Sequence, residues 1–88
     1  MISKDFLITA PEGIHARPAT ALVRLTKNFN SVISLKKGDQ TIRLNSLLNI
    51  LSLGAKGGET ITILIEGADE AVAAEAIEHF FSQQLKDL

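Results

Sequence analysis

The sequence contains no cysteine, tryptophan or tyrosine and only two histidines, so it offers few side chains for covalent or redox chemistry. The absence of cysteine excludes disulfides, thiolate zinc sites and a cysteine nucleophile, and it fits a reducing compartment. No apolar run approaches the ~20 residues that span a bilayer. The opening run Met1-Ile2-Ser3-Lys4-Asp5 also lacks the basic-then-apolar layout of a signal peptide. We therefore expect a cytoplasmic protein with no membrane insertion.

An excess of charge of one sign is missing as well, since the formal net charge is −1. Such a chain has no overall attraction to nucleic acid, and any preference for a partner must come from local patches. The 88 residues are 45% hydrophobic, which suffices for one modest core. No repeat, low-complexity stretch or linker divides them. The composition predicts a single domain over residues 1–88.

Four segments alternate apolar and polar side chains, as half-buried strands do. The first covers residues 2–9, the second and third form a hairpin across a turn at 37–40, and the fourth closes at Gly67. Their apolar positions are, in chain order, Ile2, Phe6 and Ile8; Ile33 and Leu35; Ile42 and Leu44; and Ile61, Ile63 and Ile65.

Three segments show the apolar spacing of helices. The first covers residues 16–29 and the second residues 46–54, with Ser46 as N-cap and Gly54 as its end. The third follows Asp69, a candidate N-cap. Its buried side is predicted to hold Ala73, Ala76, Ile77, Phe80 and Gln84, with Leu85 in the neighbouring Phe81 row. The order is βαββαβα, which predicts an α+β fold in which a four-stranded antiparallel sheet carries three helices on one face.

His15 lies where the first strand turns into the first helix, in the segment Ala10-Pro11-Glu12-Gly13-Ile14-His15-Ala16-Arg17-Pro18-Ala19-Thr20. A helix N-terminus presents unpaired N–H groups and about half a positive charge, so an anion on His15 would meet donors that already face it. The guanidinium of Arg17 suits phosphate oxygens. A neutral imidazole can act as a nucleophile. A histidine in this place can also be an ordinary cap or loop residue.

The run Gly13-Ile14-His15-Ala16-Arg17-Pro18-Ala19 resembles the phosphorylation-site motif of HPr, the phosphocarrier family of the bacterial sugar phosphotransferase system. The resemblance extends to Asn45-Ser46-Leu47-Leu48, Ser52-Leu53-Gly54 and Gly67-Ala68-Asp69-Glu70. It implies an open-faced β-sandwich without a cofactor. It also implies that His15 takes a phosphoryl group from Enzyme I on Nδ1, that Arg17 holds its oxygens, and that IIA proteins receive it. Such a protein is a stoichiometric carrier and not an enzyme.

A docking surface for acidic partners is expected beside His15. Basic residues recur at helical spacing along the first helix, and the leucines of the short helix cannot all point inward at once. The alternative is an ordinary solvated face above leucines that belong to the core. We assign docking of partners to Thr20, Arg24, Lys27, Leu47, Leu48 and Leu51 and expect a monomer.

Ser46 has two interpretations, and both can hold. One is the N-cap; the other is the regulatory site that HPr kinase phosphorylates in many Gram-positive relatives. The second would add HPr kinase/phosphorylase and a transcriptional regulator to the partners that the resemblance implies. The sequence carries Asn45-Ser46-Leu47-Leu48 where those relatives commonly carry Lys-Ser-Ile-Met, so the regulatory interpretation stays open.

Glu12 is a second departure, because the family more often has a small neutral polar residue there. A carboxylate near a phosphoryl group repels it unless it points away or pairs with a cation. The other histidine, His79, is expected on the exposed side of the last helix. No histidine pairs with His15 at metal-ligand spacing, so no metal is expected.

Three other functions compete with the sugar-type carrier. A regulatory carrier of the nitrogen-type branch would share the fold and His15. A small-ligand binding domain would need a pocket unrelated to this histidine. A histidine-dependent phosphohydrolase ranks last, because the sequence shows no set of carboxylates and cations that would position a water.

Overall fold

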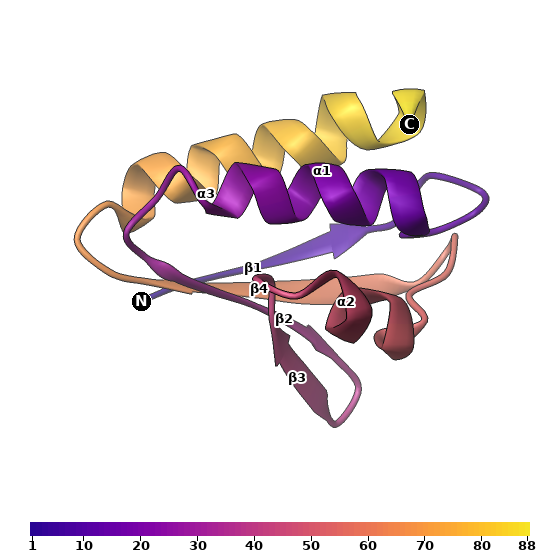
Figure 1. Cartoon of the computed structure of the whole chain (residues 1–88), viewed down its shortest axis with the longest axis horizontal. Coiled ribbons are helices and arrows are strands. Elements are labelled where there is room, and N and C mark those ends of the chain that lie inside the picture. The colour runs from indigo at the N-terminus through magenta and orange to yellow at the C-terminus, as the bar shows by residue number, and fades with distance from the viewer.

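The computed structural model describes the backbone of residues 1–88 and every side chain except that of Lys86. The order βαββαβα is confirmed (Figure 1). The elements are β1 (Ile2–Leu7), α1 (Ala16–Thr26), β2 (Val32–Lys37), β3 (Gln40–Arg43), α2 (Leu47–Leu53), β4 (Thr60–Glu66) and α3 (Glu70–His79). The last helix continues through a π-helical turn, η1 (Phe80–Gln84), and a 3₁₀ turn, η2 (Leu85–Asp87).

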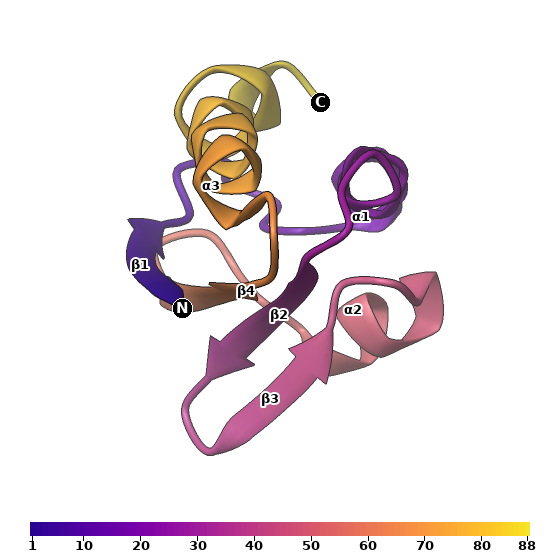
Figure 2. The same ribbon diagram turned by 90° about the vertical axis from the view of Figure 1, so that its left-hand side faces the viewer.

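The four strands form one antiparallel sheet in the order β1-β4-β2-β3. Figure 2 shows all three helices on one side of this sheet, as the sequence predicts. The register places Ile33 opposite Ile65 and Leu35 opposite Ile63, so the apolar residues of neighbouring strands lie on the same face. That face is covered by helices, and the other face is open to solvent.

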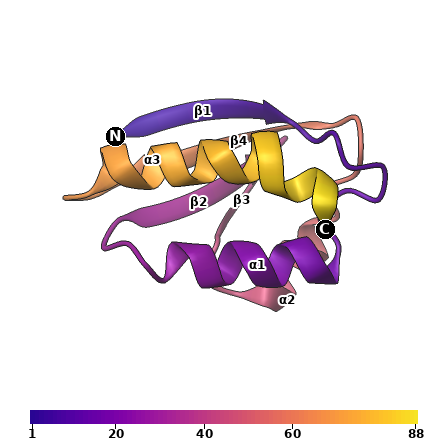
Figure 3. The same cartoon turned by 90° about the horizontal axis from the view of Figure 1, so that it is seen from above.

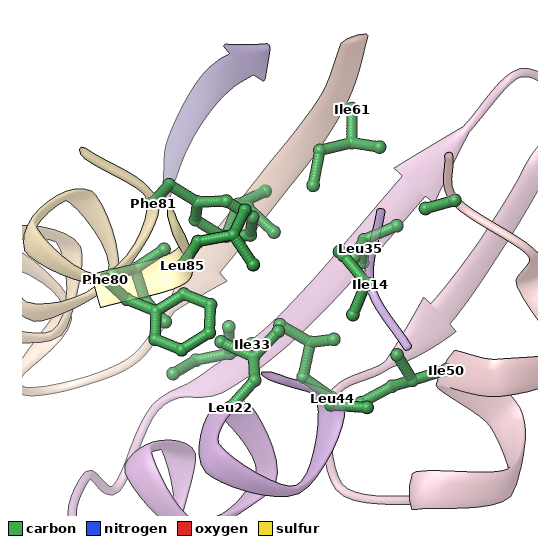
Figure 4. Packing of buried hydrophobic residues seen from close by; sticks show 14 of the residues in the cluster. Ile14, Leu22, Ile33, Leu35, Leu44, Ile50, Ile61, Phe80, Phe81 and Leu85 are labelled. Carbon is green, nitrogen blue, oxygen red and sulfur yellow. The ribbon is translucent and has the colours of Figure 1, made fainter. Parts of the chain in front are cut away.

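The core lies between the sheet and the helices (Figure 4). The fully buried side chains include Leu22 of α1, Leu35 of β2 and Ile63 of β4. Phe6 stacks on Phe81 with ring centroids 4.8 Å apart. Burial of one such side chain contributes about 1.5–3 kcal/mol to the stability of the folded state. The alternation of apolar and polar residues along the strands therefore determines which face of the sheet the helices cover.

Two elements are shorter than their sequence patterns indicate. β1 ends at Leu7 and not at residue 9, because Ile8 bonds to the loop before β4: its N–H donates to the Glu59 carbonyl at 2.9 Å, and its carbonyl accepts from Gly58 N–H at 2.8 Å. α1 ends at Thr26 and not at residue 29. The Thr26 hydroxyl lies 2.9 Å from the Leu44 carbonyl, which ties the end of the helix to the segment after β3.

Two expectations about the last helix are wrong. Gln84 is exposed, because the π-helical turn lets Leu85 N–H bond to the Phe80 carbonyl five residues back and brings Leu85 to the core in its place. Asp69 precedes α3 but makes no side-chain cap. Its carboxylate accepts from the Ser31 hydroxyl and from Asn30 N–H, and these bonds hold the pKa of Asp69 below its ordinary value of 3.8.

Candidate functional site

A tight turn leads from β1 to the start of α1. Gly13 N–H bonds to the Ala10 carbonyl at 2.9 Å, which closes the turn 10–13 around Pro11 and Glu12. Gly13 has a φ of +70°, and a Cβ on it would lie 2.2 Å from the Ala55 carbonyl oxygen. A side chain is therefore excluded here by conformation and by space.

The loop between α2 and β4 holds this turn in place, and sequence reasoning did not foresee the contact. Ile14 N–H donates to the Ala55 carbonyl at 3.0 Å, and the Ile14 side chain is buried. A Cβ on Gly57 would lie 2.6 Å from the Ala10 carbonyl oxygen. The only sequence signal was the pair Gly57-Gly58, which indicated a loop but not the segment that it contacts.

His15 is the N-cap residue of α1. Its φ of −90° and ψ of −166° are extended, and its carbonyl accepts the first helical hydrogen bond, from Ala19 N–H at 2.9 Å. The side chain makes no capping hydrogen bond and is 32% exposed. The backbone of His15 is therefore held in place while part of its ring stays accessible to solvent. A nucleophile needs both properties.

The first turn of α1 presents free backbone donors. Within the part of the chain that the structure describes, the N–H groups of Ala16 and Arg17 bond to no protein acceptor. Pro18, the third residue of the helix, has no N–H. These two amides and the exposed Arg17 side chain make this end of the helix positive, which favours an anion.

One carboxylate contacts the imidazole. Oε2 of Glu12 lies 3.2 Å from Nε2 of His15, and the Glu12 side chain is 78% exposed. Both residues line a hollow of about 220 Å³ together with Pro11, Leu85 and Leu88. Figure 3 shows the start of α1 and the C-terminus at the same end of the molecule. Glu12 thus has a partner that can carry positive charge, which is the condition under which a carboxylate is tolerated at this site.

The docking residues assigned on α1, which are Thr20, Arg24 and Lys27, do not all lie together. Arg17, Thr20 and Arg24 line one shallow hollow of about 370 Å³ on α1. Lys27, the C-cap of α1, lines a different hollow with Thr26 and Arg43. The structure therefore brings Arg17, Thr20 and Arg24 together along α1 and leaves Lys27 in a separate hollow at the far end of the helix.

The short helix α2 exposes apolar side chains next to α1. Leu48 is 75% exposed, and Leu47 and Leu51 are each 38% exposed, whereas Ile50 and Leu53 are buried. The two helices contact each other. The three exposed leucines are thus a surface feature and not a part of the core.

Ser46 caps α2, since its Oγ accepts from Asn49 N–H at 3.3 Å. Gly54 ends the helix in the left-handed conformation, as expected. His79 is exposed, also as expected. The side chains that the structure describes contain no group of three or more potential metal ligands. In the same part of the chain, no helix has the length and apolar character needed to cross a membrane.

Comparisons with known proteins match nearly the whole chain. The model of the family described as "PTS HPr component phosphorylation site" matches residues 2–83. The fold is similar to that of HPr-C-His from Thermoanaerobacter tengcongensis, with a TM-score of 0.91, 28% identity and coverage of 100% of this chain and 98% of that chain. The match to the histidine-containing phosphocarrier protein of Mycoplasma has a TM-score of 0.90 and 30% identity, and it covers 96% of both chains. The match to phosphocarrier protein HPr of Bacillus anthracis has a TM-score of 0.85 and 31% identity, and it covers 92% of this chain and 96% of that chain.

Proposed function

Because the chain belongs to the HPr family of phosphotransferase-system phosphocarriers, we propose that His15 is the residue that receives the phosphoryl group and passes it on. Members of this family are phosphohistidine relay proteins and not catalysts themselves. One observation carries the proposal: the half-buried imidazole belongs to the N-cap residue of a helix whose first amides have no partner among the described residues. A phosphoryl group on the ring would meet those donors without rearrangement of the backbone.

The chemistry follows from this geometry. The Nδ1 lone pair of neutral His15 attacks the phosphorus of the donor, a nitrogen–phosphorus bond forms, and the electron pair of the broken bond remains with the donor. The dianionic group is then stabilised by the N–H groups of Ala16 and Arg17 and by the Arg17 guanidinium. These interactions are exposed to solvent, so the bond remains accessible to the next acceptor.

Enzyme I and IIA proteins are the partners that the family implies, and the surface around His15 supports docking of acidic proteins. The hollow with Arg17, Thr20 and Arg24 supplies positive charge. The exposed leucines of α2 supply apolar area beside it. Interfaces combine such an apolar centre with a charged rim, which orients the partner and speeds its association.

Regulation at Ser46 is a further part of the proposal. A phosphate on this serine would sit at the start of α2 and next to the exposed leucines. It would add about −1.5 to −2 charges at a surface for acidic partners and would weaken their docking.

The test is phosphoryl transfer from Enzyme I and phosphoenolpyruvate to the wild-type protein. We expect one acid-labile label per chain in the wild type, none in His15→Ala, and full labelling in His79→Ala, the matched change at the other histidine. Label that persists in His15→Ala would refute the assignment. Incubation of the labelled protein with sugar-type and nitrogen-type IIA proteins then identifies the class of acceptor.

A further inference from the structure

We infer that Glu12 is a positioning residue, whose carboxylate keeps the proton of the neutral His15 ring on Nε2 and so leaves the Nδ1 lone pair free for phosphorus. The inference rests on the proposed function and assigns a role to a residue that departs from the family's usual pattern. It comes from one contact, the 3.2 Å between Oε2 of Glu12 and Nε2 of His15.

The direction of this effect follows from the hydrogen-bonding capacity of the two groups. An ionised carboxylate only accepts hydrogen bonds, whereas a neutral imidazole has one N–H and one nitrogen lone pair. If Nε2 carried the lone pair, it would face the negative oxygen of Glu12 at 3.2 Å. The tautomer with the proton on Nε2 removes this repulsion, and it places the nucleophilic lone pair on Nδ1.

The backbone restricts where the side chains of Glu12 and His15 start, although the Glu12 side chain itself is exposed. Glu12 lies in the turn that the bond between Gly13 and Ala10 closes, and Gly13 is held against the Ala55 carbonyl. His15 is held by its role as N-cap of α1. The two side chains therefore start from fixed positions, and the contact costs less conformational entropy than a pair on mobile segments.

Charges around the ring divide into two sides. Glu12 lines the hollow that His15 shares with Leu85 and Leu88, and Arg17 lines the neighbouring hollow on α1. Glu12 is thus placed to act on the ring, whereas Arg17 is placed to act on the phosphoryl oxygens.

The same carboxylate also compensates the charge that transfer creates. When the Nδ1 lone pair forms its bond to phosphorus, the bond from phosphorus to the donor breaks and its electron pair stays with the donor. The Nε2 proton remains, so the ring becomes positively charged. The Glu12 carboxylate at 3.2 Å lowers the energy of this charge as it develops.

The first test measures the tautomer in the unphosphorylated protein, by ¹⁵N NMR of the histidine ring at a mildly alkaline pH chosen above the ordinary titration range of imidazole. We expect the Nε2–H form to dominate in the wild type. In Glu12→Gln the ratio of the two tautomers should move toward Nδ1–H by about two- to fivefold, the range for exposed charged pairs. Glu75→Gln is the matched control, because it removes the same charge from an exposed position on α3.

The second test measures how fast each variant accepts a phosphoryl group from Enzyme I. We expect Glu12→Gln to be slowed about two- to fivefold and Glu75→Gln to match the wild type. An unchanged tautomer ratio in Glu12→Gln overturns the inference, and so does acceptance as fast as or faster than the wild type, since faster acceptance means that Glu12 repels the incoming group. The NMR measurement needs no phosphorylation, so its failure is distinct from loss of labelling at His15.

Discussion

At the scale of single residues, the proposed carrier site divides its work between side chains and backbone. In this proposal His15 supplies the nucleophile and Arg17 an exposed positive charge. The amides of Ala16 and Arg17 supply fixed dipoles that need no side-chain ordering. The stabilisation of a dianionic phosphoryl group on the ring therefore depends on backbone geometry as much as on the identity of the side chains.

Gly13 is the residue on which that backbone geometry depends most. We expect Gly13→Ala to destabilise the protein by at least about 2 kcal/mol more than Gly38→Ala, as urea denaturation measures it. Both glycines have positive φ, +70° and +59°, so each substitution carries a cost of about 1–2 kcal/mol. Only at Gly13 would the new Cβ also overlap a neighbouring atom, since nothing lies within 4 Å of the corresponding position at Gly38. Equal losses would show that the contact with Ala55 relaxes freely.

At the scale of elements, α1 and α2 present their N-terminal ends in different ways. The N-cap residue of α1 is His15, whose side chain makes no capping hydrogen bond, so the first amides of the helix are open. The N-cap residue of α2 is Ser46, whose hydroxyl oxygen already accepts a hydrogen bond from Asn49 N–H. The first arrangement favours a visiting anion, and the second favours stability of the helix.

The start of α2 allows a test of regulation by charge. We expect Ser46→Asp to accept phosphoryl groups from Enzyme I roughly fivefold more slowly than the wild type, because one added charge beside a surface for acidic partners costs ~1 kcal/mol even in water. Asp is a good N-cap, so the helix should persist in circular dichroism. Ser52→Asp, which adds the same charge to an exposed position near the other end of α2, serves as the control. If the two variants slow transfer equally, the position of Ser46 has no special effect on docking.

At the scale of the whole molecule, the sheet topology assembles the site from distant parts of the chain. Because β4 pairs antiparallel with the edge strand β1, the loop before β4 reaches the turn that follows β1. The helical C-terminus returns to the same end of the molecule (Figure 3). There Leu85 and Leu88 line the hollow that also contains His15.

At the opposite end of the molecule, Asp69 links the start of α3 to the connection between α1 and β2. Its carboxylate accepts hydrogen bonds from the Ser31 hydroxyl and from Asn30 N–H in that connection. The lowered pKa of Asp69, caused first by Ser31 and then by Asn30, means that the folded state binds this proton more weakly than the unfolded chain does. Its contribution to stability is therefore present at neutral pH and is lost as the pH falls through and below the ordinary value of 3.8.

We accordingly expect Asp69→Asn to lower the melting temperature at pH 7 and to make little difference in strong acid, as thermal denaturation at a series of pH values measures it. Asp39→Asn, in the exposed turn between β2 and β3, removes the same charge and is the control. A loss of stability in Asp69→Asn that does not change with pH would contradict the linkage.

The sequence by itself determined the order of elements, the buried faces of the strands and the position of His15 before a helix, because alternation, helical spacing and turn residues are local properties of the chain. Its errors, at the ends of β1 and α1, at Gln84 and at the cap of Asp69, fall where local and tertiary preferences differ. A π-helical turn brought Leu85 to the core, and Ser31 bonded the carboxylate that was expected to cap α3.

Only the tertiary structure decided what surrounds the imidazole. The contact of Gly13 with Ala55 joins segments about forty residues apart, and no periodicity within either segment indicates it. The contact of Glu12 with His15 depends on that packing, because the angle of the turn sets where the carboxylate points. Local sequence therefore supplied the proposed nucleophile, whereas long-range packing supplied its surroundings, since those depend on how the sheet brings distant backbone together.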